Sequence, residues 1–153
     1  MKLKTLDKKF MKNKTVKVIF DTNVWISFLI GKQLSKIKQY ISGGQILIVT
    51  TEQLLSEIMI VTNREKLKKY FPKENVKELI DLLETIAEKV EIKPTHFINR
   101  DPKDNFLLDL IDYSKADYLV TGDNDLLEHN PFKTAKILNP SEFEEEIEKL
   151  PNS

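Results

Sequence analysis

The stretch VKVIFDTN, residues 16–23, carries a mostly apolar run of five residues directly into Asp21. A short apolar run bounded by turn signals is typical of a strand buried in a parallel sheet. Two similar runs follow, ILIVT at residues 46–50 and YLVTG at residues 118–122, and the second leads into Asp123. Ligands of open α/β sheets bind just beyond the carboxyl ends of the strands. We therefore expect acids at these strand ends to meet at one edge of the sheet.

Outward from these runs, strands and helices alternate along the chain. This alternation predicts an α/β fold with a mainly parallel central sheet flanked by helices. The expected strands are residues 16–20, 46–50, 90–92, 118–121 and 136–138, and the expected helices are residues 22–41, 51–62, 64–71, 74–89, 102–115, 124–128 and 141–149. Residues 1–15 lack a clear period and are predicted to form a basic tail. Residues 16–153 are long enough for one domain with its own core.

Three helices carry recognisable signals at their ends or faces. Thr50 and Gln53 have the spacing of a capping box before the helix that follows the second strand. Asp101 is predicted to cap the helix that begins with Pro102. The helix at 74–89 has a continuous apolar stripe, which favours core packing, with a share of a dimer interface as the alternative. Its members are Val76, Leu79, Ile80, Leu83, Ile86, Ala87 and Val90.

Composition limits the class of protein. The 153 residues include no cysteine, which excludes disulfides and thiolate metal sites. No apolar run approaches the roughly 20 residues that span a bilayer, so we expect a cytoplasmic protein without a membrane partner. The 24 basic and 24 acidic residues cancel, so the molecule as a whole is not built to attract polyanions. The lysines of residues 2–17 fit a solvated tail or, alternatively, an arm that contacts nucleic-acid phosphates.

Four acids are candidates for a functional site, and each also has a structural explanation. Asp21 and Asp123 occupy natural N-cap positions, and Asp104 favours the positive end of a helix dipole. Glu57 falls among the apolar residues of its helix. Alternatively, it lies at the edge of the apolar face, with its carboxylate in water. An ionised carboxylate on an apolar face is costly unless it is paired or bound to a cation. Each acid is at least 19 positions from the next, so only the fold can assemble them.

Four motifs stand in a particular order along the chain: VIFDTN at residues 18–23, Glu57, RDPKDN at residues 100–105, and DYLVTGD at residues 117–123. Together they resemble the ordered motifs of PIN-domain nucleases. The likeness extends over about residues 16–140 and is strongest to small prokaryotic PIN proteins regarded as toxin components of toxin–antitoxin pairs. The resemblance implies that Asp21, Glu57, Asp104 and Asp123 are catalytic acids that bind metal.

The same resemblance implies that Asn23 and Thr121 support the site and that Asp125 could be an additional acid. It implies magnesium or manganese as the cofactor and RNA as the substrate of a metal-dependent ribonuclease. Many family members are homodimers, and their antitoxins bind over the site, so a homodimer and an antitoxin partner are expected here. The long basic tail is not part of the usual pattern, which leaves the regulatory partner open.

The residue types suit this chemistry. Phosphodiester hydrolysis needs an activated water and relief of negative charge, and paired metal ions provide both. Oxygen-only ligands suit magnesium or manganese. Zinc is disfavoured, because the chain lacks cysteine and because His96 and His129 lie outside the acidic motifs, where loop or surface positions are expected. RNA contacts must come from basic residues such as Arg64 and Lys103, whereas Trp25 is expected to be core.

Two other classes of function compete with a nuclease. A receiver domain of a signalling pathway needs adjacent acids after its first strand and an aspartate after a middle strand. Here the first strand leads into DTN, and the strand at 46–50 ends in two threonines, so this class is disfavoured. A non-catalytic PIN-like module that binds RNA or protein remains the alternative.

Overall fold

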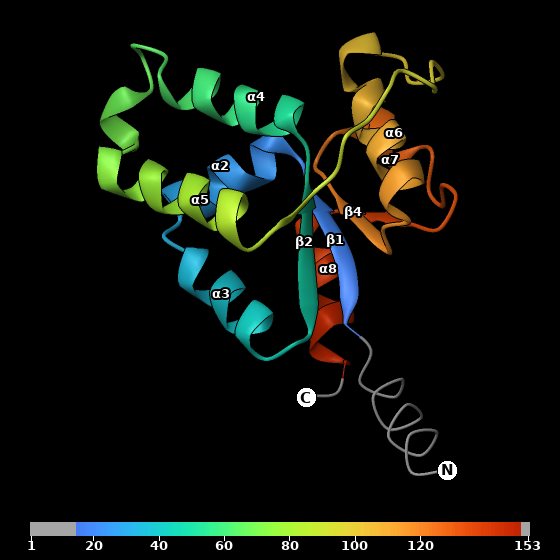
Figure 1. Cartoon of the computed structure of the whole chain (residues 1–153), viewed down its shortest axis with the longest axis horizontal. Helices are drawn as coiled ribbons and strands as arrows, with labels where there is room; N and C mark the ends of the chain where they lie inside the picture. The colour runs from blue at the N-terminus through green and yellow to red at the C-terminus, as the bar shows by residue number, and fades with distance from the viewer. Residues whose placement is uncertain (1–14, 151–153) are drawn as a thin grey trace.

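The computed structural model describes residues 15–150, so the predicted basic tail lies outside the described residues except for Thr15. Strands and helices alternate along this part of the chain, with five strands in one sheet (Figure 1). In chain order the elements are β1 (Val16–Phe20), α2 (Thr22–Ile30), α3 (Leu34–Ser42), β2 (Ile46–Thr50), α4 (Glu52–Thr62), η1 (Lys68–Tyr70), α5 (Lys73–Thr85), β3 (Glu88–Lys89), η2 (Pro102–Asp104), α6 (Asn105–Ser114), β4 (Tyr118–Val120), α7 (Asn124–Leu127), β5 (Lys136–Leu138) and α8 (Pro140–Glu148).

All neighbouring strands of the sheet are parallel, in the order β3-β2-β1-β4-β5. The predicted α/β fold with a parallel central sheet is confirmed. The central strand β1 pairs with both β2 and β4, so that Val18 lies between Ile48 and Tyr118. The chain first builds outward from β1 through β2 to β3, and then crosses to the opposite side for β4 and β5. This reversal leaves a topological switch point between the ends of β1 and β4.

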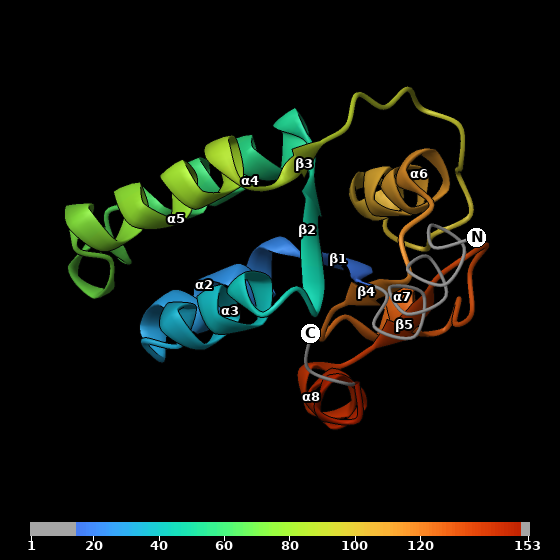
Figure 2. The ribbon, with the colours of Figure 1, turned by 60° about the horizontal axis from the view of Figure 1, so that its bottom comes forward.

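Helices cover both faces of the sheet. In Figure 2, α6 and α8 lie on opposite sides of β4 and β5, and α2 to α5 gather beside β2. Val18, Ile19 and Phe20 of β1 are fully buried, as expected for a central strand. Trp25 is also fully buried and meets the Phe20 ring edge-on at 5.0 Å, which confirms its assignment to the core. In the described part of the chain, none of the helices is long and apolar enough to cross a membrane.

The predicted helix at 22–41 is wrong as a single element, because it breaks after Ile30. Lys32 has a left-handed backbone conformation with a φ of 54°. The N–H of Lys32 donates to Leu29 O, and that of Gln33 donates to Phe28 O, which is the hydrogen-bond pattern of a Schellman motif. The apolar periodicity continues across the break in α3, so the pattern alone did not reveal it.

Several other boundaries also differ from the prediction. The helix expected at 64–71 is only the short 3-10 turn η1, and α5 ends at Thr85, so that the third strand occupies Glu88–Lys89 and not 90–92. The predicted capping box at Thr50 is wrong: Thr50 is the last residue of β2, and its buried hydroxyl has no hydrogen-bond partner. Because Thr50 pairs within the sheet, Thr51 is the N-cap of α4, and its side chain makes no capping hydrogen bond.

The apolar stripe of α5 packs mainly into the core. Leu79 and Leu83 are fully buried, and Leu82 joins them. Ile86 follows the end of the helix and is 51% exposed, so the stripe does not continue into a buried position there. The core function predicted for this helix is confirmed, and its share in a dimer interface stays a prediction.

Candidate active site

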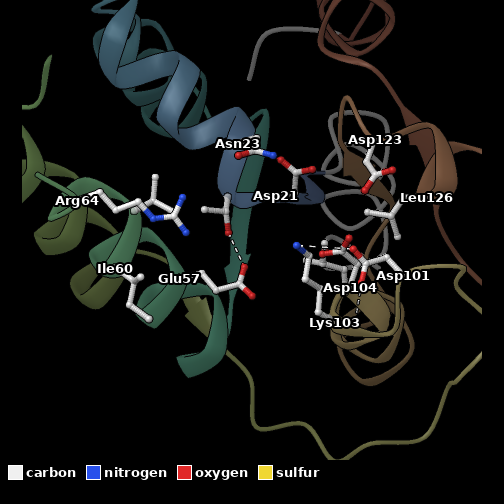
Figure 3. Close-up of a pocket in the computed structure, with 13 residues that line it drawn as sticks. Asp21, Asn23, Glu57, Ile60, Arg64, Asp101, Lys103, Asp104, Asp123 and Leu126 are labelled. Atoms are coloured by element: carbon white, nitrogen blue, oxygen red, sulfur yellow. Dashed lines mark hydrogen bonds and ion pairs between the residues drawn. The ribbon is translucent and has the colours of Figure 1, made fainter. Parts of the chain in front are cut away.

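A cavity of about 450 Å³ opens at the carboxyl ends of β1 and β4, at the switch point of the sheet (Figure 3). Side chains from four separate stretches of chain line it. They are Asp21, Thr22, Asn23, Glu57, Ile60, Val61, Arg64, Asp101, Lys103, Asp104, Leu107, Asp123 and Leu126. The structure thus brings the four predicted acids to one pocket, although they are spread over more than 100 positions of sequence. Their function as metal ligands stays a prediction.

Asp21 is the most deeply placed of the acids. Its Oδ1 accepts a hydrogen bond of 2.9 Å from the Val24 backbone N–H, so it caps α2 as well as lining the pocket. Its Oδ2 accepts a hydrogen bond from the Thr121 hydroxyl. The side chain is 6% exposed, and this burial raises the pKa of Asp21 above its ordinary value, although both hydrogen bonds oppose the rise. Asp21 is therefore both a helix cap and a site residue.

Thr121 connects the acids of the two central strands. While its hydroxyl donates to Asp21, the same oxygen accepts a hydrogen bond of 3.0 Å from the backbone N–H of Asp123. Asp123 in turn caps α7 through a bond of 2.9 Å from the Asp125 N–H to its Oδ1. Thr121 itself is fully buried behind the pocket. One hydroxyl thus fixes the relative positions of the β1 and β4 acids.

Glu57 approaches the pocket from α4, opposite the third acidic motif (Figure 3). It is half-buried, at the edge of the apolar face and not within it, and neighbouring Ile60 is 61% exposed. Its Oε2 accepts a hydrogen bond of 2.8 Å from the hydroxyl of Thr22, the first residue of α2. This bond joins two helices and orients the Glu57 carboxylate toward the pocket.

Asp104 ends the 3-10 turn η2 and immediately precedes α6, so the helix predicted from residue 102 begins three residues later. Asp101 caps the turn by accepting a bond of 3.2 Å from the Lys103 N–H. Burial, and then the charges of Asp101 and Asp123, raise the pKa of Asp104 from 3.8 to about 6. Negative charge is therefore concentrated at this wall, and Asp101 contributes to it in addition to its predicted capping function.

The segment before η2 is held by a polar network centred on Asn99, which is almost fully buried. Its backbone N–H donates to Asn105 Oδ1 at 2.9 Å, and its side-chain amide donates to Asp101 O at 2.9 Å. The Asn99 Oδ1 accepts a hydrogen bond of 3.0 Å from His129 Nε2. His129 thus occupies a loop, as predicted, and connects the loop after α7 to the segment that delivers Asp104.

The three predicted supporting residues occupy different positions. Asn23 lines the pocket, and Thr121 lies directly behind it. Asp125 does not line the pocket, and its carboxylate lies 4.0 Å from the Arg100 guanidinium. Asp125 as an additional acid of the site stays a prediction.

Sequence reasoning missed the Thr22–Glu57 contact and named Arg64 only among many basic residues. Arg64 follows the end of α4 by two residues and lines the pocket. Because the helix ends at Thr62, helical spacing from Glu57 does not place Arg64 there. No spacing signal connects Thr22 with Glu57, because their contact depends on how α2 packs beside α4.

The residues of the pocket are compatible with a hard divalent cation. Their donors include carboxylate and hydroxyl oxygens, and burial, followed by the charges of Asp101 and Asp123, raises the pKa of Asp104. Among residues 15–150, however, no three Asp, Glu or His side chains converge closely enough to hold one ion by themselves. Magnesium commonly binds through one or two carboxylates and keeps several waters. Separate carboxylates around a roomy pocket fit that mode of binding.

Comparison with known proteins gives a consistent result. The family model of the PIN domain matches residues 17–125, which include all four acids of the pocket. The uncharacterized protein MJ1680 of Methanocaldococcus jannaschii is 32% identical over 146 residues, a match that spans 88% of this chain and 94% of the relative. With its parallel sheet and with most of its length inside the family model, the chain belongs to the PIN-domain family.

Proposed function

We propose that this protein is a ribonuclease that depends on magnesium or manganese and hydrolyses RNA phosphodiester bonds in the cytoplasm. PIN domains are generally nucleases. The observation that carries the proposal is the meeting of Asp21, Glu57, Asp104 and Asp123 around one pocket at the switch point of the sheet. An acidic pocket repels phosphate by itself, so a nuclease built on it needs cations.

In this proposal the four acids hold the metal. Bound there, divalent ions supply an activated water and relief of charge on the scissile phosphate. Thr121 keeps the Asp21 carboxylate at the end of β1, and Thr22 keeps Glu57 turned into the cavity. Lys103 and Arg64 lie at opposite walls, where their positive charges favour the phosphates that flank the scissile one.

Metal dependence is the direct test. With excess chelator, cleavage of a fluorescent RNA oligonucleotide should stop, and added magnesium or manganese should restore it. The same ions should raise the melting temperature, because a ligand that binds only the folded state stabilises it by about 2.7 kcal/mol at a concentration 100 times its Kd. Full activity in excess chelator would refute the proposal. Metal-induced stabilisation without cleavage of any RNA would favour the non-catalytic, RNA- or protein-binding module.

We also propose that the protein is a homodimer and the toxin component of a toxin–antitoxin pair. This part rests on the resemblance of the four motifs to those of small prokaryotic PIN toxins. Expression of the chain should arrest growth of a host cell, and co-expression of the product of the adjacent gene should relieve the arrest. Light scattering of the purified protein measures the oligomeric state. Unimpaired growth with an active enzyme would refute the toxin function while leaving the chemistry intact.

A further inference from the structure

The connection between α4 and α5 is strongly basic in a protein whose total charge is zero. Residues 64–73, which we call the α4–α5 arm, contain five basic residues and one acid, Glu65, and so carry a net charge of +4. The five are Arg64, Lys66, Lys68, Lys69 and Lys73. Several lysines elsewhere have ion-pair partners, as in Lys36–Glu144 and Lys136–Glu146. Within residues 15–150, Lys68 is the only cation of the arm with an ion-pair partner.

The arm begins at the pocket. Arg64 lines the cavity at the wall across from the acids of η2 (Figure 3). Its backbone carbonyl accepts hydrogen bonds from the N–H groups of Leu67 and Lys68, which lead into the turn η1. On the opposite wall Lys103 is matched by an acid, since it lies 3.6 Å from Asp101; outside the pocket lining, Arg100 lies 4.0 Å from Asp125. Positive charge without a nearby acid is thus concentrated on the α4 side.

The arm holds a defined conformation with its charges outward. Phe71 is buried and Leu67 is partly buried against the core, while Lys66 and Lys69 are exposed. Tyr70 is 52% exposed, and the Lys69 ammonium lies 5.1 Å from the centre of its ring. A basic track combined with an exposed aromatic ring is how proteins bind unpaired nucleic-acid strands, by contacting phosphates and stacking a base. Figure 1 shows the arm at the far end of the α4–α5 pair, away from the sheet.

We propose that the α4–α5 arm is an RNA-binding surface that guides one flank of a single-stranded RNA into the acidic pocket. The strand leaves the metal site along the α4 face, passes the exposed Ile60 and Arg64, and reaches Lys66, Lys69 and Tyr70. The assignment rests on the proposed ribonuclease function for the substrate, but the surface binds RNA whether or not cleavage occurs. The α6 side of the pocket contributes less to affinity.

Binding without cleavage tests this proposal. In an Asp21→Asn background, with chelator present, the affinity for a fluorescent 20-nucleotide oligouridine is measured from 50 to 200 mM salt. The double substitution Lys66→Gln and Lys69→Gln should weaken binding about tenfold at 100 mM salt. The slope of the logarithm of the association constant against log salt should become less negative by about 1.4, the value for two lost single-strand phosphate contacts.

The matched control is Lys133→Gln with Lys149→Gln, which removes the same net charge from residues outside the arm and the pocket. This control should change the affinity less than twofold. An equal loss of affinity in the two double variants would show a general effect of net charge and would refute the RNA-binding role of the arm. Circular dichroism and melting curves verify that both variants fold.

Tyr70→Leu separates stacking from charge. It should weaken binding of oligouridine about tenfold without changing the salt slope, and it should leave binding of a duplex RNA unchanged. An unaltered affinity for the single strand would overturn the single-strand assignment. If the wild-type protein cleaves RNA but the arm substitutions do not change binding, only the RNA-binding role of the arm is refuted. If the arm substitutions weaken binding but no metal-dependent cleavage occurs, only the nuclease function is refuted.

Discussion

The two halves of the acidic pocket are built on different kinds of structure. Asp21 and Asp123 leave neighbouring parallel strands, and Thr121 joins them through a buried hydroxyl. Glu57 and Asp104 come instead from α4 and η2, on facing walls, and both are half-buried. The strand-end half is fixed by sheet pairing, including the bond of 3.1 Å from the Asp21 N–H to Val120 O. The helical half is fixed only by packing and by short side-chain bonds.

This difference indicates how the site works. Backbone pairing is a rigid support, and functional groups on strand ends are held more exactly than groups on turns. We therefore expect the walls that carry Glu57 and Asp104 to hold their carboxylates less firmly than the strand ends hold Asp21 and Asp123. Within the described residues, no three carboxylates lie close enough together to hold one ion.

The largest effect is expected at the rigid half. Asp21→Asn should reduce RNA cleavage by more than about 100-fold, the upper limit for losing an outer-shell partner of a metal ligand. The fold should survive, because asparagine can still accept the bond from the Val24 N–H and because one buried negative charge is removed. Initial cleavage rates and melting curves measure both. Near wild-type turnover would show that the strand-end half is not the centre of the site.

Two matched threonine substitutions compare the halves directly. Thr121→Val removes the hydroxyl that fixes buried Asp21, and Thr22→Val removes the one that orients half-buried Glu57. We expect Thr121→Val to cost about 1–3 kcal/mol of stability, since a buried carboxylate loses its donor. Its activity should fall about 10- to 100-fold.

Thr22→Val should lower the free energy of unfolding by less than about 1.5 kcal/mol, because water can replace the lost donor at Glu57. Its activity should fall about tenfold or less. The magnesium concentration for half-maximal activity should rise more in the Thr121 variant. Equal losses in stability and activity would mean that the two halves are equally rigid, which would contradict the comparison.

The smallest effect concerns the charge on the helical wall. Because the folded-state pKa of Asp104 is raised from 3.8 to about 6, the folded protein binds this proton more tightly than the unfolded chain. Its contribution to the stability of the metal-free protein is therefore present below pH 4 and is lost as pH rises to about 6. Solvent screening around this partly exposed side chain limits the change to about 1 kcal/mol.

Melting temperatures of the metal-free wild type and Asp104→Asn across pH 4 to 7 isolate this effect from the other titrating groups. The melting temperature of the variant relative to that of the wild type should rise with pH and then level off near pH 6. Asp101→Ala is the companion variant: it should cost about 1 kcal/mol through the lost cap and should move the transition of Asp104 to lower pH. A difference between wild type and Asp104→Asn that does not vary with pH would refute the charged wall.

The order of strands and helices followed from local patterns, because burial of β1, β2 and β4 on both faces leaves continuous apolar runs. Helix boundaries were predicted wrongly where the apolar pattern continued through a backbone break, as at Lys32. Thr50 was misassigned because strand pairing, which local spacing does not encode, overrode a capping signal.

Residue type and local period were enough to predict the α/β class, the acids at the strand ends and the oxygen-only character of the candidate ligands. That Asp21, Glu57, Asp104 and Asp123 share one pocket follows only from the folded arrangement. The same arrangement places Thr22 and Thr121 against two of these acids and brings Arg64, the first residue of the basic arm, to the pocket. These contacts join distant positions, and only strand order and helix packing bring such positions together.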